Sequence, residues 1–270
     1  MSHHSQPDRI SKKRVVYTLP DVEVVTVRRD QPYRATGADA LMDLYYPPDS
    51  KTGAPTAAVV FVTGFSDDGA QKAIGCKQKE MGSYVSWAQL AAASGLVAIT
   101  YTNTEPATDV QAVLQHIRQN AAALAIDENR IGVWACSGSV PTVLSVLMQA
   151  TRDRVKCAVL CYGYTLDADG STSVADAARQ WGFASPCAGK SVDDLSQDIP
   201  LFIARAGQDQ MPGLNDTLDR FLFKTLACNL PITFVNHATA PHAFDLFHDT
   251  DTTREVIRRI LAFLRFHLLD

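Results

Sequence analysis

Short apolar runs, many of them rich in β-branched residues, alternate along the chain with segments in which apolar residues recur every three or four positions. Continuous apolar runs of this length are typical of strands buried on both faces, and the second spacing is typical of helices with one apolar stripe. The runs expected to form buried strands are 57–62, 96–101, 131–135, 155–161, 201–206 and 232–235. This alternation predicts an α/β fold, in which a mostly parallel sheet is flanked by helices.

Two segments that precede these runs, 22–27 and 41–46, are predicted to form an antiparallel lead-in to the sheet. The second segment is followed by Pro47 and Pro48. Proline stops a strand because its φ is fixed and it has no N–H to donate to a neighbouring strand. We therefore expect the sheet to begin with antiparallel pairing before its parallel part.

Three segments show the helical spacing most clearly. Apolar residues recur over 110–124 after Pro106, a residue favoured in the first turn of a helix. The segment 87–93 stops just before Gly95, which can adopt the left-handed conformation of a helix cap. The tail 256–268 has an apolar stripe opposite a charged face. These segments are expected to cover the sheet.

Two long segments interrupt this alternation. The first, 64–84, is rich in Gly, Asp, Lys and Gln, and connections of this length are usually functional or mobile. The second, 163–198, is too long for a simple loop and too short for a domain, so it is predicted to be an inserted lid with one or two short helices. Within it, Trp181 and Phe183 are expected to line an apolar pocket.

The domain organisation predicted from these segments is an N-terminal arm over residues 1–20 and a single domain over residues 21–270, with the lid inserted at about 163–198. The arm has a short basic cluster but lacks the apolar region and the small-residue cleavage site of a secretory signal. A cytoplasmic location is therefore expected.

Charge and composition exclude several classes of function. The chain has 25 Lys and Arg against 29 Asp and Glu, with no run that interleaves aromatic and basic residues, so no nucleic-acid partner is expected. No window approaches the ~18 apolar residues of a membrane-spanning helix, so no membrane partner is expected either. Six cysteines are scattered without CxxC pairs, which argues against a metal site. No cofactor is predicted, and the oligomeric state stays open.

The segment 131–148 (IGVWACSGSVPTVLSVLM) carries the strongest chemical signal. A buried strand passes through a group of small residues directly into an apolar helix. This pattern is typical of a nucleophile elbow, a strained turn in which the residues two before and two after the nucleophile must be small. With Ser137 as the nucleophile, these two positions hold Ala135 and Ser139, which are both small.

Two neighbouring residues are alternative nucleophiles, and both fit the elbow less well. A nucleophile at Cys136 would have Trp134 two positions before it, and a nucleophile at Ser139 would have Pro141 two positions after it. Neither residue is small enough where the strand and the helix nearly touch. Steric fit therefore favours Ser137, although the flanking glycines of the usual G-x-S-x-G pattern are replaced here.

A serine nucleophile needs a general base, which in turn needs an acid to hold its tautomer. The segment 236–249 follows the last predicted strand and offers three histidines. His237 lies close to the strand end and His248 lies close to the next helix, whereas His242 lies in the middle of the loop. His242 is therefore the predicted base, because a loop position lets it face the carboxyl edge of the sheet.

The acid is expected at the end of an earlier strand. Asp209 follows the strand 201–206 and a glycine turn, whereas its rivals Asp216 and Asp219 fall within a predicted helix. Asp209 could also serve as a simple turn residue or as a helix cap. The order nucleophile, acid, base is that of the α/β-hydrolases, and it differs from the order in chymotrypsin and in subtilisin.

Acyl transfer also requires donors for the oxyanion. The predicted donors are the backbone N–H of Gly138, which follows the nucleophile, and the backbone N–H of Phe65, in the loop after the strand 57–62.

The sequence resembles the α/β-hydrolase superfamily, and most of all its dienelactone-hydrolase-like and bacterial carboxylesterase branches. The resemblance spans residues 40–266 and is carried by the segments DLYYP, SWAQLAAASGLVAITY, DENRIGVWACSGS, AGQD and PHAFD. It implies a mostly parallel eight-stranded sheet and a serine hydrolase mechanism. Dienelactone hydrolases proper use a cysteine nucleophile, whereas this chain has Ser137 at that position.

Together these features predict a carboxylesterase that acts on a small-molecule ester through an acyl-enzyme on Ser137, with His242 and Asp209 completing the triad. An amide or peptide hydrolase is the closest alternative, because the same triad serves both reactions. A non-catalytic ligand-binding protein on the same scaffold is the third possibility, since a fold does not determine function. The long segments 64–84 and 163–198 could also serve as docking surfaces for a partner.

Overall fold

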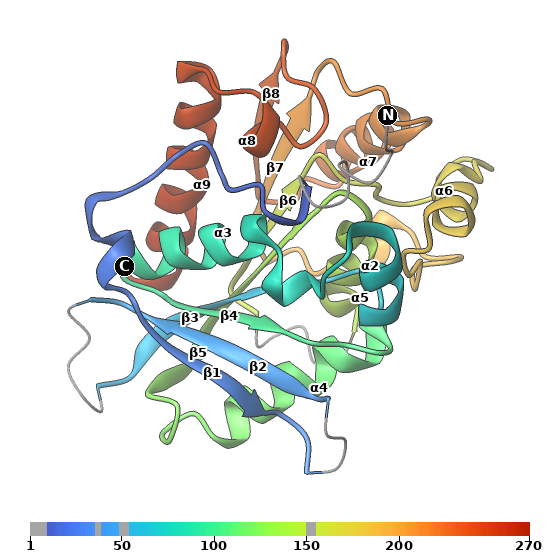
Figure 1. Cartoon of the computed structure of the whole chain (residues 1–270). Coiled ribbons are helices and arrows are strands. Elements are labelled where there is room, and N and C mark those ends of the chain that lie inside the picture. The colour runs from blue at the N-terminus through green and yellow to red at the C-terminus, as the bar shows by residue number, and fades with distance from the viewer. Residues whose placement is uncertain (1–9, 36–38, 49–53, 150–154) are drawn as a thin grey trace, which may run out of the picture.

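Eight strands form one sheet in the order β1-β2-β4-β3-β5-β6-β7-β8 (Figure 1). The computed structural model describes residues 10–35, 39–48, 54–149 and 155–270. The strands are β1 (Thr26–Pro32), β2 (Leu41–Tyr46), β3 (Thr56–Phe61), β4 (Val97–Tyr101), β5 (Ile126–Cys136), β6 (Cys157–Cys161), β7 (Leu201–Ala206) and β8 (Ile232–His237). β2 is antiparallel to both of its neighbours, and the remaining pairs are parallel. The expected antiparallel lead-in and the parallel body are therefore confirmed.

The helices lie on both faces of this sheet. The α-helices are α2 (Asp67–Ile74), α3 (Gly82–Ala93), α4 (Pro106–Gln119), α5 (Val140–Leu147), α6 (Ser173–Trp181), α7 (Leu214–Ala227), α8 (Phe244–Phe247) and α9 (Asp251–Leu268). Short 3-10 helices are η2 (Pro20–Val24), η3 (Gln78–Glu80), η4 (Ser137–Ser139) and η6 (Val192–Asp194). None of the helices in the described part of the chain is long and apolar enough to cross a membrane.

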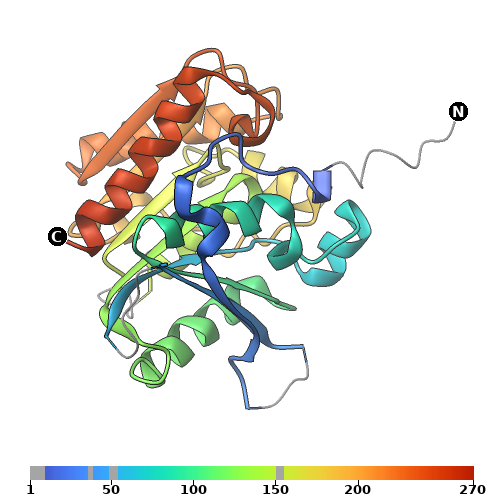
Figure 2. The same cartoon turned by 60° about the vertical axis from the view of Figure 1, so that its left-hand side comes forward.

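Side chains that point alternately to the two faces of the central strands divide the core into two layers. In β3, Val60 belongs to the core layer that also includes residues of α4, α5 and α7, whereas Val59 and Phe61 belong to the layer that includes residues of α3 and α9. Side chains on a strand point alternately to opposite faces, so a strand buried on both sides reads as one continuous apolar run. Figure 2 shows α9, the last helix of the chain, lying across the strands of its face.

The first predicted strand, 22–27, is placed wrongly. The chain instead forms η2 and then β1, whose residues are mostly exposed. Pro20 favours a helical turn at the start of this region, because its fixed φ suits a first-turn position. β1 lies at the edge of the sheet and carries charged residues, so the apolar pattern used to find strands does not mark it.

The two long segments are more structured than plain loops. The segment 64–84 holds α2 and η3 and leads into α3, so its interpretation as one long connection is wrong. Its polar residues hid the short helix, which Ser66 caps by accepting a hydrogen bond from the N–H of Gly69. The segment 163–198 holds α6 and η6, in line with the short helices expected there.

The described start of the chain lies across α3 (Figure 2). The Val15 N–H donates to Ser86 Oγ at 3.0 Å, and the Val16 N–H donates to the carbonyl of Asp245 at 2.8 Å. These bonds connect the N-terminal segment to α3 and to the loop region after β8.

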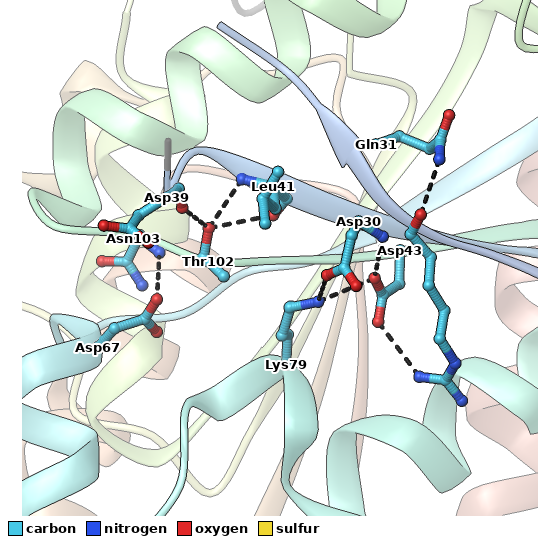
Figure 3. A network of polar contacts seen from close by, with 10 residues as sticks. Asp30, Gln31, Asp39, Leu41, Asp43, Asp67, Lys79, Thr102 and Asn103 are labelled. Atoms are coloured by element: carbon cyan, nitrogen blue, oxygen red, sulfur yellow. Dashed lines mark hydrogen bonds and ion pairs between the residues drawn. The ribbon is translucent and has the colours of Figure 1, made fainter. Parts of the chain in front are cut away.

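A buried lysine ties the edge of the sheet to the segment before α3. Lys79 Nζ lies 2.6 Å from Asp30 Oδ1 and 2.9 Å from Asp43 Oδ1, so that three elements meet at one ammonium group (Figure 3). Asp43 is 1% exposed, and its other oxygen lies 3.5 Å from the exposed side chain of Arg29. A buried carboxylate needs this compensation, because a charge taken out of water without a partner is strongly destabilising.

The substitution Lys79→Met is expected to lower the free energy of unfolding by about 3–5 kcal/mol, because it leaves the carboxylate of Asp43 buried without its main partner. Urea denaturation measures this change. The matched control Arg29→Met removes an exposed partner of the same carboxylate and is expected to cost less than about 1 kcal/mol. Equal losses in the two variants would contradict the role given to Lys79.

Candidate active site

Ser137 lies in a strained turn between β5 and α5. Its φ is +53°, in the left-handed region that a residue with a Cβ rarely adopts. The single turn of η4 then leads directly into α5. Strain of this kind persists only where the surrounding structure enforces it, and it occurs at functional sites. The structure therefore contains the sharp strand-turn-helix connection predicted from 131–148.

Close backbone packing explains why this region holds small residues. A Cβ added at Gly64 would lie 2.4 Å from the carbonyl oxygen of Gly138, and one added at Gly163 would lie 2.2 Å from Val140 Cγ2. Ser139 is 1% exposed, and a larger side chain there would have no room. The loops after β3 and β6 are thus pressed against the turn that carries Ser137.

The three residues predicted from separate parts of the sequence come together in the structure. Ser137 Oγ lies 3.0 Å from His242 Nε2, and His242 Nδ1 lies 2.6 Å from Asp209 Oδ2. The Asp209 side chain is completely buried, and its other oxygen accepts the N–H of Met211 at 2.9 Å. Asp209 is thereby held in the orientation that directs one oxygen at the imidazole ring.

The rival residues have other partners. His237 is buried at the end of β8, where its Nε2 lies 3.0 Å from Thr253 Oγ1. The ring of His248 packs against that of His237, with 5.2 Å between the centroids. Asp216 and Asp219 both form ion pairs with arginines near the surface of α7. None of these four side chains contacts Ser137.

Two backbone N–H groups in the loops around Ser137 have no internal acceptor. Among the described residues, no carbonyl or side chain accepts a hydrogen bond from the N–H of Phe65 or of Gly138. The peptide that carries the Phe65 N–H is held at its other end, because Gly64 O accepts the N–H of Ala184 at 2.7 Å. The N–H and C=O of a trans peptide point in opposite directions, so this bond orients the Phe65 N–H.

The segment after α6 also packs against the backbone of Gly138. A Cβ added at Gly138 would lie 2.7 Å from the ring of Phe183, so the aromatic ring rests directly on the Gly138 backbone. Phe183 stacks on Tyr164 with 5.4 Å between centroids and meets the Phe65 ring edge-on at 6.0 Å. Phe183 therefore lies against both Gly138 and Phe65. Trp181, by contrast, is 46% exposed and lines the cavity described below.

Ser139 links the turn to the loop after β3. Its Oγ accepts the N–H of Gly64 at 2.9 Å and lies 3.4 Å from the hydroxyl of Tyr84. A glycine at position 139, as in the usual G-x-S-x-G pattern, has no side chain to accept this bond. Having Ser139 in place of the usual glycine therefore adds a hydrogen bond between the turn and the loop after β3.

A buried carboxylate lies behind the histidine. The Tyr162 ring meets the His242 ring edge-on, with 5.2 Å between centroids, and the Tyr162 hydroxyl donates to Asp245 Oδ1 at 2.6 Å. The Trp87 indole N–H donates to Asp245 Oδ2 at 2.7 Å. Burial raises the pKa of Asp245, against the effect of these hydrogen bonds. Sequence reasoning gave Asp245 no role, although it ends the PHAFD segment that contains His242.

A cavity of about 390 Å³ opens beside Ser137 and His242. This volume falls within the range of roughly 300–1,000 Å³ found for small-molecule sites. No Lys, Arg or Glu lies among the described residues of its wall. The wall is built mainly from α2, the start of α3, the loop around α8 and Trp181, and its apolar members include Ala70, Ala73, Ile74, Met81, Leu246 and Phe247.

Cys136, the rival nucleophile, is a poor one in this environment. Burial and the nearby carboxylate of Asp245 raise the pKa of the Cys136 thiol well above its ordinary value. Thiols react as thiolates, so a raised pKa suppresses reactivity. All six cysteines are free, and in the described part of the chain no group of three or more His, Cys, Asp and Glu side chains is arranged to hold a metal ion.

No family model matches the chain, and no curated protein sequence matches it significantly. Solved structures do resemble it. An esterase from Rhizomucor miehei has a TM-score of 0.71 at 14% identity, with 100% of this chain and 93% of that chain covered. A thermostable carboxylesterase from a metagenomic library has a TM-score of 0.66 at 16% identity, with 97% and 95% covered. An α/β-hydrolase enzyme from a deep-sea metagenome has a TM-score of 0.63 at 15% identity, with 91% and 99% covered.

These likenesses establish the fold. The chain has the α/β-hydrolase fold, with the eight-stranded and mostly parallel sheet that the sequence resemblance implied.

A partly buried carboxylate lies beside the loop that carries Phe65. Asp67 Oδ2 accepts the N–H of Asn103 at 3.1 Å, whereas Asp67 Oδ1 is buried and has no hydrogen-bond partner (Figure 3). The Asn103 amide in turn donates to Thr63 Oγ1 and to the carbonyl of Phe65. Burial raises the pKa of Asp67 from 3.8 to about 6.

This raised pKa predicts a pH-dependent stability. The folded chain binds the Asp67 proton more tightly than the unfolded chain does, so the stabilising contribution is full below pH 3.8 and is lost as the pH rises through about 6. Asp67→Asn stays neutral and keeps an acceptor for Asn103. Its free energy of unfolding, relative to wild type, is expected to rise by about 1–2 kcal/mol between pH 4 and pH 7.5, as urea denaturation measures. The exposed neighbour provides the control, and a similar rise in Asp68→Asn would refute the assignment.

Proposed function

We propose that this protein is a carboxylesterase that hydrolyses small, uncharged esters through an acyl-enzyme on Ser137. The observation that carries the proposal is the continuous contact from Ser137 Oγ to His242 Nε2 and from His242 Nδ1 to buried Asp209. A serine, a histidine and a buried aspartate in this geometry form a catalytic triad, in which the histidine activates the serine and the aspartate orients the histidine. The esterases among its structural neighbours support the same reaction class.

In the proposed first step, Ser137 Oγ attacks the ester carbonyl carbon while His242 Nε2 takes the hydroxyl proton. Asp209 holds the imidazole in the tautomer that leaves Nε2 free to accept, and it stabilises the imidazolium that forms. The tetrahedral intermediate then collapses, the C–O bond to the alcohol breaks, and His242 returns the proton to the leaving alkoxide. Water attacks the acyl-enzyme in the same way, which releases the acid and restores the Ser137 hydroxyl.

The oxyanion of each tetrahedral intermediate is proposed to accept hydrogen bonds from the N–H groups of Phe65 and Gly138. Both groups lack an internal acceptor. The Phe65 peptide is held by the hydrogen bond from the Ala184 N–H to Gly64 O, and the Gly138 backbone is held by packing against Phe183. Donors held in place before the reaction stabilise developing charge without a cost of reorganisation. On this basis, the segment after α6 has a structural part in catalysis besides covering the site.

The apolar wall of the cavity supports the proposed substrate class. The described wall has no Lys or Arg to pair with an anionic substrate, and its carboxyl group, Asp245, is already hydrogen-bonded to Tyr162 and Trp87, so desolvating a substrate charge there would be costly. Ser137 and the protonated thiol of Cys136 favour carboxylesterase chemistry over that of dienelactone hydrolases proper, which use a cysteine. The triad by itself would also serve amide hydrolysis, so ester and amide substrates are compared in the experiment that follows.

The first experiment tests Ser137 directly. Wild type is expected to hydrolyse p-nitrophenyl esters, and a fluorophosphonate probe is expected to add to Ser137, as mass spectrometry of the labelled peptide would show. Ser137→Ala should lower kcat by about 10³-fold or more, because the nucleophile is lost while the fold stays intact. Matched p-nitroanilides separate ester from amide hydrolysis. Absence of both turnover and labelling would overturn the proposal and favour a non-catalytic binding protein.

The second experiment asks whether Phe183 holds the proposed oxyanion donors in place or only contributes to substrate binding. Phe183→Ala removes the ring that rests on Gly138, so kcat is expected to fall by roughly 10- to 100-fold as the donors loosen. The control Trp181→Ala removes an aromatic ring from the cavity wall of the same segment, and it should act mainly on KM. Circular dichroism confirms that each variant is folded. An unchanged kcat in folded Phe183→Ala would rule out this role.

A further inference from the structure

One wall of the active-site cavity carries polar groups that the protein itself does not use. Gln78 and Ser83 both line the cavity, and each residue is only 7% exposed. Gln78 Oε1 is buried without a partner, and neither side chain forms a hydrogen bond with any described residue. A buried amide without partners is destabilising, because it has lost its hydrogen bonds to water and gained none in the folded protein. Such a group calls for an explanation, and a bound ligand is one.

Most of the other polar side chains of the wall are engaged within the protein. The Tyr84 hydroxyl donates to the carbonyl of Val62, and Asp245 accepts from Tyr162 and Trp87. The Trp134 indole N–H is buried in the wall without a hydrogen-bond partner, and it can only donate. Apart from this indole and the proposed catalytic groups, the hydrogen-bonding capacity that is left for a ligand is concentrated on η3 and the start of α3.

The surroundings of this polar wall decide what kind of group it suits. Ala70, Ile74 and Met81 line the same cavity, and no Lys, Arg or Glu lies among the described wall residues. An amide side chain offers both a donor and an acceptor, which matches an uncharged group with the same two capacities. A hydroxyl or a carboxamide has them. A carboxylate would find no Lys or Arg in the described wall, and the carboxyl group of Asp245, which could face an ammonium, already accepts from Tyr162 and Trp87.

We propose that Gln78, assisted by Ser83, selects esters whose acyl or alcohol part carries an uncharged hydroxyl or amide group. This inference rests on the proposed esterase function and specifies its substrate class. A plain alkyl chain would leave the Gln78 amide unpaired when it excludes water from the cavity. A chain with a hydroxyl or an amide at the right depth would pair with it. Sites built to hydrogen-bond a substrate group reject the analogue that lacks it, because their own polar groups are then left unsatisfied.

The test compares matched ester pairs on wild type and on Gln78→Met, which keeps the length of the side chain and removes the amide. One series places a terminal hydroxyl or acetamido group on the acyl chain of a p-nitrophenyl ester, and the other places it on the alcohol of an alkanoate ester. In at least one series, wild type is expected to favour the polar member at least tenfold in kcat/KM over its alkyl analogue. Gln78→Met should abolish this preference and raise kcat/KM for the alkyl ester.

Two controls make the result specific. Gln71→Met makes the same substitution at an exposed position of α2 and should leave the preference unchanged. Ser83→Ala should reduce the preference partially. A wild-type ratio near one in both series, or a ratio that survives Gln78→Met, would overturn the inference.

Measuring ester binding directly tests the role of Gln78 independently of whether the protein is an esterase. Ser137→Ala retains the cavity but lacks the proposed nucleophile, so calorimetry can measure its affinity for the same intact esters. A polar preference that appears there and disappears on adding Gln78→Met supports the inference even if wild type proves inactive. Equal affinity for the polar and alkyl esters refutes it, whatever the activity of wild type.

Discussion

The site depends on one strained residue. Ser137 takes a left-handed backbone conformation at the end of β5, and this turn directs its side chain toward His242. Such a conformation costs of order 1–3 kcal/mol and survives only if the neighbouring structure over-determines it. Here the surrounding loops supply that constraint, because Gly64 and Gly163 let two backbones approach to distances that a Cβ would forbid. Packing against the turn therefore shapes Ser137 and the backbone of Gly138, which are the proposed nucleophile and one of the proposed oxyanion donors.

Parallel pairing accounts for the convergence of the site. The loops after β3, β5, β6, β7 and β8 all leave the same edge of the sheet, since these strands run in one direction. Residues more than a hundred positions apart, such as Ser137 and His242, can meet there without any long-range rearrangement of the core. The candidate site thus lies outside the carboxyl ends of parallel strands, which is where ligands generally bind in open α/β sheets.

The buried polar side chains in this part of the molecule differ in how fully they are hydrogen-bonded. Asp245 is saturated by two donors and holds Tyr162 against the histidine, whereas Asp67 and Gln78 each keep an oxygen without a partner. The segment 64–84 contributes both of these incompletely satisfied residues and much of the cavity wall. This segment combines a short capped helix with buried polar groups, a pattern that is costly for stability alone and that suits a recognition surface.

Local sequence patterns were enough to predict the alternation of strands and helices, the parallel sheet and the three polar residues that meet at its edge. These predictions depend on apolar periodicity, on small residues around Ser137, and on Asp209 and His242 following strand ends. Other features emerge only in the three-dimensional structure: the position of η2 and β1, the helix within 64–84, the packing of Phe183 on Gly138, and the carboxylate of Asp245 near the His242 ring. These features rest on contacts between distant segments or on an exposed edge, and such contacts leave no periodic trace in the sequence.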